Sequence, residues 1–239
     1  MLPALLIDGT RSDLLLIADH ASNLVPPGID LGIAPELMEQ HIAVDIGVKP
    51  LAERLCDMLG CPAVLGGVSR LVIDYNRELD AHGLIPEASD GEVIVGNIGL
   101  SKDGSEARIA RWWRPYHESI SGKIAASRPN MLISLHSFTP QLSSRSEERP
   151  WQIGVLYNDD DRAARVAIPL LEARDIVTGD NLPYSGKVLN ATMNTHGEGN
   201  GIAYLGLEVR QDLIGDAEGV ARWADILAPV IAETAESLA

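Results

Sequence analysis

The sequence has few cysteines, few aromatic residues and no long apolar run. Its two cysteines, Cys56 and Cys61, cannot form a disulfide framework, and we expect two reduced thiols in the core. No apolar stretch approaches the roughly 20 residues of a bilayer-spanning helix, which argues against an integral membrane protein. The apolar start of the chain is interrupted by Asp8 and lacks a basic flank, so it does not have the pattern of a secretory signal. A cytoplasmic protein is expected.

Positive charge is also scarce. The chain has 19 Lys and Arg residues against 34 Asp and Glu residues, and its formal net charge is −15 at pH 7. A field of that sign repels phosphate backbones and anionic membrane surfaces, so neither nucleic acid nor a membrane is an expected partner. An anionic small molecule would have to be received by arginines placed in its binding site.

Length and hydrophobic content predict one domain over residues 1–239. Of these 239 residues, 46% are hydrophobic, and no repeat or linker divides the chain. Strand patterns alternate with helix patterns, which predicts an α/β fold with a mixed or parallel central sheet covered on both faces. Strands are expected at 13–19, 62–68, 131–135, 152–157 and 202–209, helices at 35–59 (broken near Gly47 and Pro50), 103–127, 160–174 and 216–238, and long loops at 139–150 and 179–200.

Polar side chains collect where three of these strands end. Asp19 ends the first strand and His20 follows it, His136 follows Leu135, and Glu208 belongs to the last strand. In open α/β sheets the ligand site lies beyond the carboxyl ends of the strands. Two histidines and a glutamate at one edge would suit a divalent metal and a carboxylate that takes a proton from water. The alternative for each histidine is a hydrogen-bonded structural role.

Two arginines flank an apolar triplet in the segment 69–77. The planar fork of Arg70 or Arg77 can bind a carboxylate through two hydrogen bonds, which favours an anionic substrate. Salt bridges of these arginines with Asp74 and Glu78 are the alternative.

Eight segments between residues 19 and 214 follow one another in the order of a known family. They are DHASNLVP (19–26), HIAVDIG (41–47), SRLVIDYNR (69–77), PYH (115–117), LISLHSF (132–138), GDNLPYSG (179–186), THGEGNG (195–201) and LEVRQDLI (207–214). In these segments the chain resembles the N-formylglutamate amidohydrolases. The resemblance implies a mixed, twisted sheet between helices, similar to zinc carboxypeptidases and aspartoacylases.

The resemblance also implies roles for individual residues. His20 and His136 match the metal-binding histidines, Asn76 and Arg77 match the pair that binds a substrate carboxylate, and Glu208 matches the general base.

The third metal ligand departs from the wider fold. That fold has a glutamate three residues after the first histidine, where this chain has Asn23. An amide oxygen is a weaker zinc ligand than a carboxylate, so either Asn23 or Asp45 would complete the set. Asp19 is expected to orient an imidazole through a hydrogen bond without binding the metal itself.

Other candidates complete the expected site. Arg70 and Arg210 join Arg77 as binding partners for a dianionic substrate. His196, in a glycine-rich loop, would approach the substrate, with an exposed loop residue as the alternative. Structural roles are expected for His41, His82 and His117.

The predicted activity is metal-assisted hydrolysis of N-formyl-L-glutamate to formate and L-glutamate. Zinc is the expected cofactor, with cobalt as an alternative, and the expected partner is a small anionic amino-acid derivative. One alternative is a deacylase or carboxypeptidase-like peptidase acting on another N-acyl amino acid. The other is a metal-free carboxylate-binding protein with a degenerate site. No feature of the sequence indicates an oligomeric state.

Overall fold

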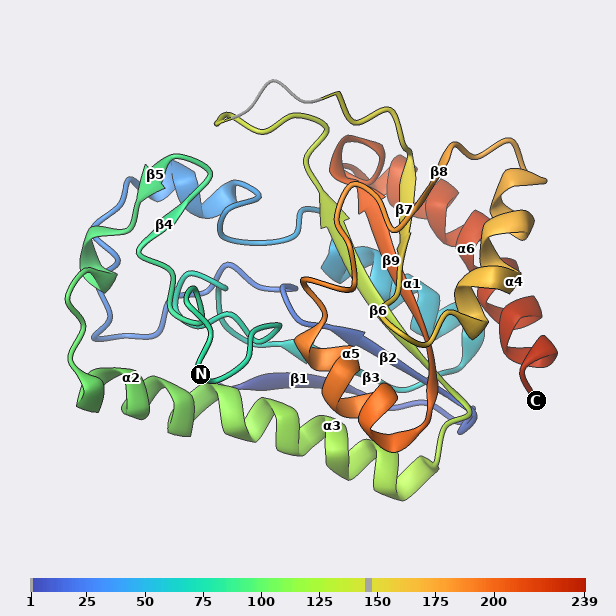
Figure 1. The fold of residues 1–239 in the computed structure, drawn as a ribbon, viewed down its shortest axis with the longest axis horizontal. Helices are drawn as coiled ribbons and strands as arrows, with labels where there is room; N and C mark the ends of the chain where they lie inside the picture. Colours follow the sequence, from blue (N-terminus) through green and yellow to red (C-terminus); the bar gives the residue numbers. More distant parts are fainter. Residues whose placement is uncertain (1, 145–147) are drawn as a thin grey trace.

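A seven-stranded mixed sheet forms the centre of the computed structural model, which describes residues 2–144 and 148–239 (Figure 1). The strands lie in the order β1-β3-β2-β6-β9-β7-β8. Their bounds are Ala4–Ile7 (β1), Leu14–Ala18 (β2), Ala63–Gly66 (β3), Met131–Phe138 (β6), Ile153–Leu156 (β7), Thr178–Asp180 (β8) and Ala203–Arg210 (β9). A separate small hairpin pairs Ala88–Ser89 (β4) with Glu92–Val93 (β5).

Helices cover both faces of this sheet. Three of them, α1 (Val48–Leu59), α4 (Arg162–Glu172) and α6 (Ala217–Ser237), share one apolar core with the sheet. On the other face lie α3 (Arg114–Ser127) and α5 (Ala191–His196) (Figure 1). They pack through side chains such as Ile120 and Met193. The α/β fold predicted from the sequence is confirmed.

The three central strands are largely apolar because both of their faces are covered. Strands β2, β6 and β9 pair in parallel, and every residue of β2 and β6 is buried. Strand β7 runs antiparallel to β9, which makes the sheet mixed. The carboxyl ends of β2, β6 and β9 therefore meet at one edge.

The segment predicted as one broken helix over 35–59 contains a short 3₁₀ helix, Pro35–Glu39, and then α1. The helix starts only after Gly47, whose φ is 79° and whose missing Cβ would lie 2.2 Å from the carbonyl oxygen of Ile214. Only glycine fits this left-handed, closely packed position. The chain between the two helices is thereby free to carry Asp45 toward the sheet.

Several other segments differ from the prediction, including the short strands β4, β5 and β8, which were not predicted. Strand β1 was not predicted, although it pairs antiparallel with β3. The helix predicted over 103–127 comprises α2 (Lys102–Arg108), a π-helical stretch Ile109–Trp113 and α3. Pro115 lies in the first turn of α3, where proline is tolerated. The predicted loop 179–200 contains α5, and the part of the predicted loop 139–150 at 145–147 lies outside the described residues.

The remaining short 3₁₀ helices are Val95–Asn97, Glu198–Asn200 and Gln211–Leu213. Within residues 2–144 and 148–239, no helix is both long and apolar enough to cross a membrane.

Candidate functional site

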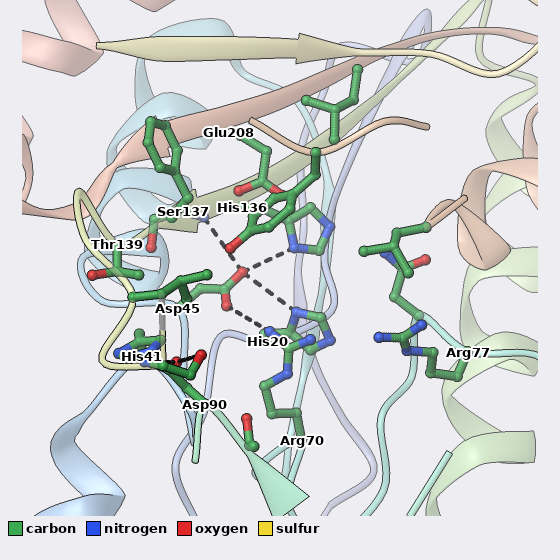
Figure 2. Close-up of a pocket in the computed structure, with 18 residues that line it drawn as sticks. His20, His41, Asp45, Arg70, Arg77, Asp90, His136, Ser137, Thr139 and Glu208 are labelled. Carbon is green, nitrogen blue, oxygen red and sulfur yellow. Dashed lines mark hydrogen bonds and ion pairs between the residues drawn. The ribbon is translucent and has the colours of Figure 1, made fainter. Parts of the chain in front are cut away.

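A cavity of about 340 Å³ opens at the carboxyl ends of β2, β6 and β9 (Figure 2). His20 reaches it from the residues after β2, His136 from β6 and Glu208 from β9. Arg70 and Arg77 line it from the irregular segment that follows β3. The sheet thus brings together side chains that are far apart in the sequence.

His20, Asp45 and His136 form a buried cluster at the base of this cavity. Each offers one metal-ligating atom, and these atoms lie within 4.8 Å of one another. The Oδ2 atom of Asp45 is 2.9 Å from His136 Nδ1 and 3.4 Å from His20 Nδ1, and Figure 2 shows this carboxylate facing both imidazoles. Two nitrogens and one carboxylate oxygen, with a position left open, are the donor set of many catalytic zinc sites.

A second carboxylate lies behind each imidazole. His20 Nε2 is 2.7 Å from Asp74 Oδ1, and His136 Nε2 is 3.4 Å from Asp19 Oδ2. Such outer carboxylates fix the orientation and tautomer of metal-binding histidines.

The hydrogen-bond donors and acceptors around His20 are arranged as expected for a site that holds a cation. A carboxylate can only accept, so the outer nitrogen of His20 carries the hydrogen that it donates to Asp74. In a neutral imidazole the inner nitrogen, Nδ1, then presents a lone pair to an oxygen of Asp45 that also has only lone pairs. Nδ1 has no hydrogen-bond partner among the described residues. Either a proton or a metal ion must lie between these two atoms.

The titration of the cluster agrees with this interpretation. Burial alone would raise the pKa of Asp45, but the two histidines outweigh it and lower that pKa well below its usual range. Burial alone would lower the pKa of His136, but Asp19 and Asp45 outweigh it and raise that pKa. The pocket therefore strongly favours positive charge at this position.

Glu208 is the candidate acid/base group. It pairs with His136 in the parallel register of β6 and β9, so both side chains reach the same cavity. Burial raises the pKa of Glu208 to about 7, and its buried Oε2 atom has no hydrogen-bond partner in the described part of the chain. A carboxylate with a pKa near the working pH is suited to take up and return a proton.

The two cavity arginines, Arg70 and Arg77, differ in how many carboxylates their guanidinium groups contact. Arg70 donates to Asp74 Oδ2 at 2.9 Å and to Asp45 Oδ1 at 3.3 Å, so its fork is occupied by the cluster. Arg77 makes only a 3.7 Å ion pair with Asp74 among the residues that the structure describes. Its half-exposed guanidinium is available to a carboxylate. Asn76 lines the cavity beside it and accepts a hydrogen bond from the backbone of Thr192.

Three of the predicted site residues lie outside the cavity lining. Asn23 donates to Glu39 at 3.0 Å, and Arg210 donates to Asp212 at 2.8 Å. His196 is buried at the end of α5 rather than exposed in a loop. Of the two alternatives for the third ligand, Asp45 is the one that lies with the histidines.

His196 instead contacts another histidine. Its Nε2 lies 2.8 Å from His117 Nδ1, while His117 Nε2 lies 3.0 Å from the carbonyl oxygen of Tyr75. This pair packs behind the site, on the side of the sheet that α3 and α5 cover.

The sequence did not indicate all of the lining residues. Asp74 was considered only as an arginine partner, whereas it also holds His20. His41, expected to be structural, lines the cavity and bonds to Asp90, which in turn accepts from Ser144. Tyr184 also lines the cavity. Its position inside the segment GDNLPYSG was the available signal.

A carboxylate of raised pKa with one buried oxygen, next to a candidate cation site at the strand ends of an α/β sheet, defines a hydrolase-type site. The chain belongs to the N-formylglutamate amidohydrolase family, whose model matches residues 12–215. This result confirms the resemblance predicted from the motifs, and it makes the protein an amidohydrolase.

Two solved structures share the fold over nearly their whole length. A gene product of Agrobacterium tumefaciens is 27% identical with a TM-score of 0.92, and the match covers 98% of this chain and 95% of that one. An N-formylglutamate amidohydrolase of Ralstonia eutropha is 20% identical with a TM-score of 0.80, over 100% of this chain and 98% of that one. Among curated proteins, none matches the chain.

Proposed function

We propose that this protein hydrolyses the amide bond of an N-formyl amino acid, with N-formyl-L-glutamate as the first substrate to test. The products would be formate and glutamate. The observation that carries the proposal is the position of Glu208 beside the cluster of His20, Asp45 and His136, in a chain of this family.

His20, Asp45 and His136 would hold a divalent metal ion, with zinc as the first candidate and cobalt as the second. When bound, such an ion polarises the amide carbonyl and makes water more acidic. Asp74 and Asp19 would keep the two imidazoles oriented with their inner nitrogens toward Asp45.

Glu208 would act as the general base and then as the general acid. It takes a proton from the attacking water and returns it to the nitrogen of the leaving amino acid. Because burial holds its pKa near 7, neither step is strongly uphill at neutral pH. Its buried oxygen without a partner is free to receive that proton.

Arg77 would bind a carboxylate of the substrate, with Asn76 beside it. Since Arg70 is engaged by Asp45 and Asp74, Arg77 is the stronger candidate for this contact. An anionic substrate is attracted by this local charge although the whole chain is acidic, because screening limits the long-range field to about 8 Å at physiological salt.

The decisive experiment measures formate release from N-formyl amino acids by metal-depleted protein, before and after addition of zinc or cobalt. We expect turnover only after metal addition. His20→Ala and His136→Ala should lose stoichiometric metal and activity while keeping the fold, as judged by circular dichroism. Turnover that is unchanged by metal depletion would remove the metal from the proposal. Turnover confined to N-acetyl or peptide substrates would indicate a different deacylase or peptidase.

A further inference from the structure

Tyr184 lines the same cavity as Glu208, and the proposed hydrolysis as described above does not use it. It comes from the segment between β8 and α5. Its phenol oxygen accepts a hydrogen bond from Arg149 Nη1 at 2.9 Å, and the centre of that guanidinium lies 4.9 Å from the centre of the phenol ring. The two side chains thus form one unit at the wall of the cavity.

Arg149 is an unusual partner because it is buried, with 6% of its surface exposed. It also donates to the carbonyl oxygen of Thr139 at 3.1 Å, while its Nε atom has no partner among the described residues. None of the described carboxylates contacts this guanidinium, and burying a guanidinium without such a partner costs free energy. Its contacts hold both the strand end at Thr139 and the hydroxyl of Tyr184, which fixes that hydroxyl in place.

The direction of this hydrogen bond leaves the tyrosine hydrogen free. A guanidinium can only donate, so the oxygen of Tyr184 is the acceptor. The hydrogen of that hydroxyl has no acceptor within residues 2–144 and 148–239. Burial raises the pKa of Tyr184, and the hydrogen bond from Arg149 offsets this only in part, so the phenol keeps its proton at neutral pH.

The reacting carbonyl must lie close to Glu208, which lines the same cavity as this hydroxyl. Water that gives its proton to Glu208 attacks the acyl carbon, so the acyl oxygen lies within a few ångströms of Glu208. The fork of Arg70 is occupied by Asp45 and Asp74. The hydroxyls of Ser137, Thr139 and Ser144 in the lining donate to Ile46, Gln141 and Asp90, whereas the hydroxyl of Tyr184 donates to none of the described residues.

We infer that Tyr184 donates a hydrogen bond to the acyl oxygen of the scissile amide, and that Arg149 is a positioning residue for it. The inference rests on the proposed amide hydrolysis. As the carbonyl becomes tetrahedral, negative charge grows on that oxygen and the hydrogen bond strengthens, which lowers the barrier. The cationic donor on the phenol oxygen polarises the O–H group and makes it a better donor.

The primary test is Tyr184→Phe in the metal-loaded protein, with the N-acyl amino acid that the wild type hydrolyses fastest. Removal of one oxyanion donor typically costs about 100-fold in kcat, and we expect a loss of about 10- to 100-fold with KM changed less than about threefold. Arg149→Met should also lower kcat but should add little in the Tyr184→Phe background, because both act through one hydroxyl. Arg149→Met should also raise the pKa of Tyr184. This pKa is measured from tyrosinate absorbance, with Tyr184→Phe as the reference that lacks the Tyr184 signal.

A binding measurement separates this inference from the proposed function. A phosphonamidate analogue of the N-acyl amino acid mimics the tetrahedral oxyanion, and we expect Tyr184→Phe to weaken its binding by 10-fold or more. Binding of the planar substrate should weaken less. If the wild type hydrolyses the substrate and Tyr184→Phe keeps the same kcat and the same affinity for the analogue, this inference fails but the proposed function stands. If the wild type neither hydrolyses nor binds these compounds, the proposed function and this inference both fail. If the free-energy effects of Arg149→Met and Tyr184→Phe on kcat simply add in the double variant, Arg149 is a purely structural residue.

Discussion

His20 Nε2 lies 2.7 Å from Asp74 Oδ1, and the same carboxylate accepts from Arg70 through its other oxygen at 2.9 Å. Asp74 thereby turns the inner nitrogen of His20 toward Asp45 and links the cluster of His20, Asp45 and His136 to Arg70. The irregular segment after β3 sets this geometry, since Asp74 also accepts from the backbone of Asn76.

Asp74→Asn should weaken metal binding without removing a metal ligand. Loss of an outer carboxylate lowers metal affinity by about 10- to 100-fold. Zinc competition with a chelator measures this change. Asp212→Asn, which removes a carboxylate that pairs with Arg210 away from the cavity, is the matched control and should bind zinc like the wild type. Equal affinity of Asp74→Asn and wild type would contradict the orienting role.

Glu208→Gln should keep the metal and lose turnover. The amide has the shape of the carboxylate but cannot accept the proton from water, so kcat should fall by about 100-fold or more. Metal content and kcat are measured on the same preparation. Near wild-type turnover would assign the base to another residue.

Arg77→Lys should weaken substrate use although it retains the charge. Lysine lacks the planar fork, and loss of one charged hydrogen bond corresponds to about 1–3 kcal/mol in kcat/KM. Arg77→Ala should cost at least as much. If Arg77 binds the side-chain carboxylate, Arg77→Ala should harm N-formylglutamate more than N-formylglutamine, and equal losses would place the α-carboxylate there. An unchanged kcat/KM in both variants would make Arg77 a structural salt-bridge residue.

The His117–His196 pair should make stability fall in acid. His117 Nε2 faces a carbonyl, so it carries a hydrogen, and Nδ1 can accept from His196 only while His117 is neutral. Burial and the neighbouring His117 lower the pKa of His196 to about 4, below the ordinary value of 6.5. The unfolded chain therefore binds more protons, and this stability is full above pH 6.5 and is lost as the pH falls toward 4.

His196→Gln isolates that contribution because glutamine stays neutral. Denaturant unfolding at pH 7 and pH 5 gives the free energy of unfolding of both proteins. The wild type should lose about 2 kcal/mol more than the variant between these pH values. Parallel losses in the two proteins would show that His196 does not titrate in this way.

The strands that carry the site were predictable because they are buried on both faces. Largely apolar sequences define β2, β6 and β9, and reactive polar residues follow or belong to each. The fold and the proximity of His20, His136 and Glu208 followed from these patterns and the parallel-sheet rule. The family resemblance supplied their proposed roles.

Other parts depend on tertiary packing that local patterns do not encode. Strand β1 is four residues long and half exposed, so its pattern is weak. The approach of Asp45 to the histidines depends on the left-handed turn at Gly47, and the sequence left Asn23 equally open. The glycine- and asparagine-rich composition around His196 favours a loop, yet burial of Met193 under the sheet stabilises a helix there.

The register of β6 and β9 has a consequence for engineering. The separation of His136 and Glu208 is set by a backbone ladder in the centre of the sheet, whereas Arg77 and Tyr184 are supplied by segments outside it. A substitution confined to Arg77 should change which acyl amino acids are bound while the separation of His136 and Glu208 is retained, provided that Asp74 in the same segment and Tyr184 are kept. The fold is therefore suited to engineering of substrate selectivity, with strands β6 and β9 left unchanged.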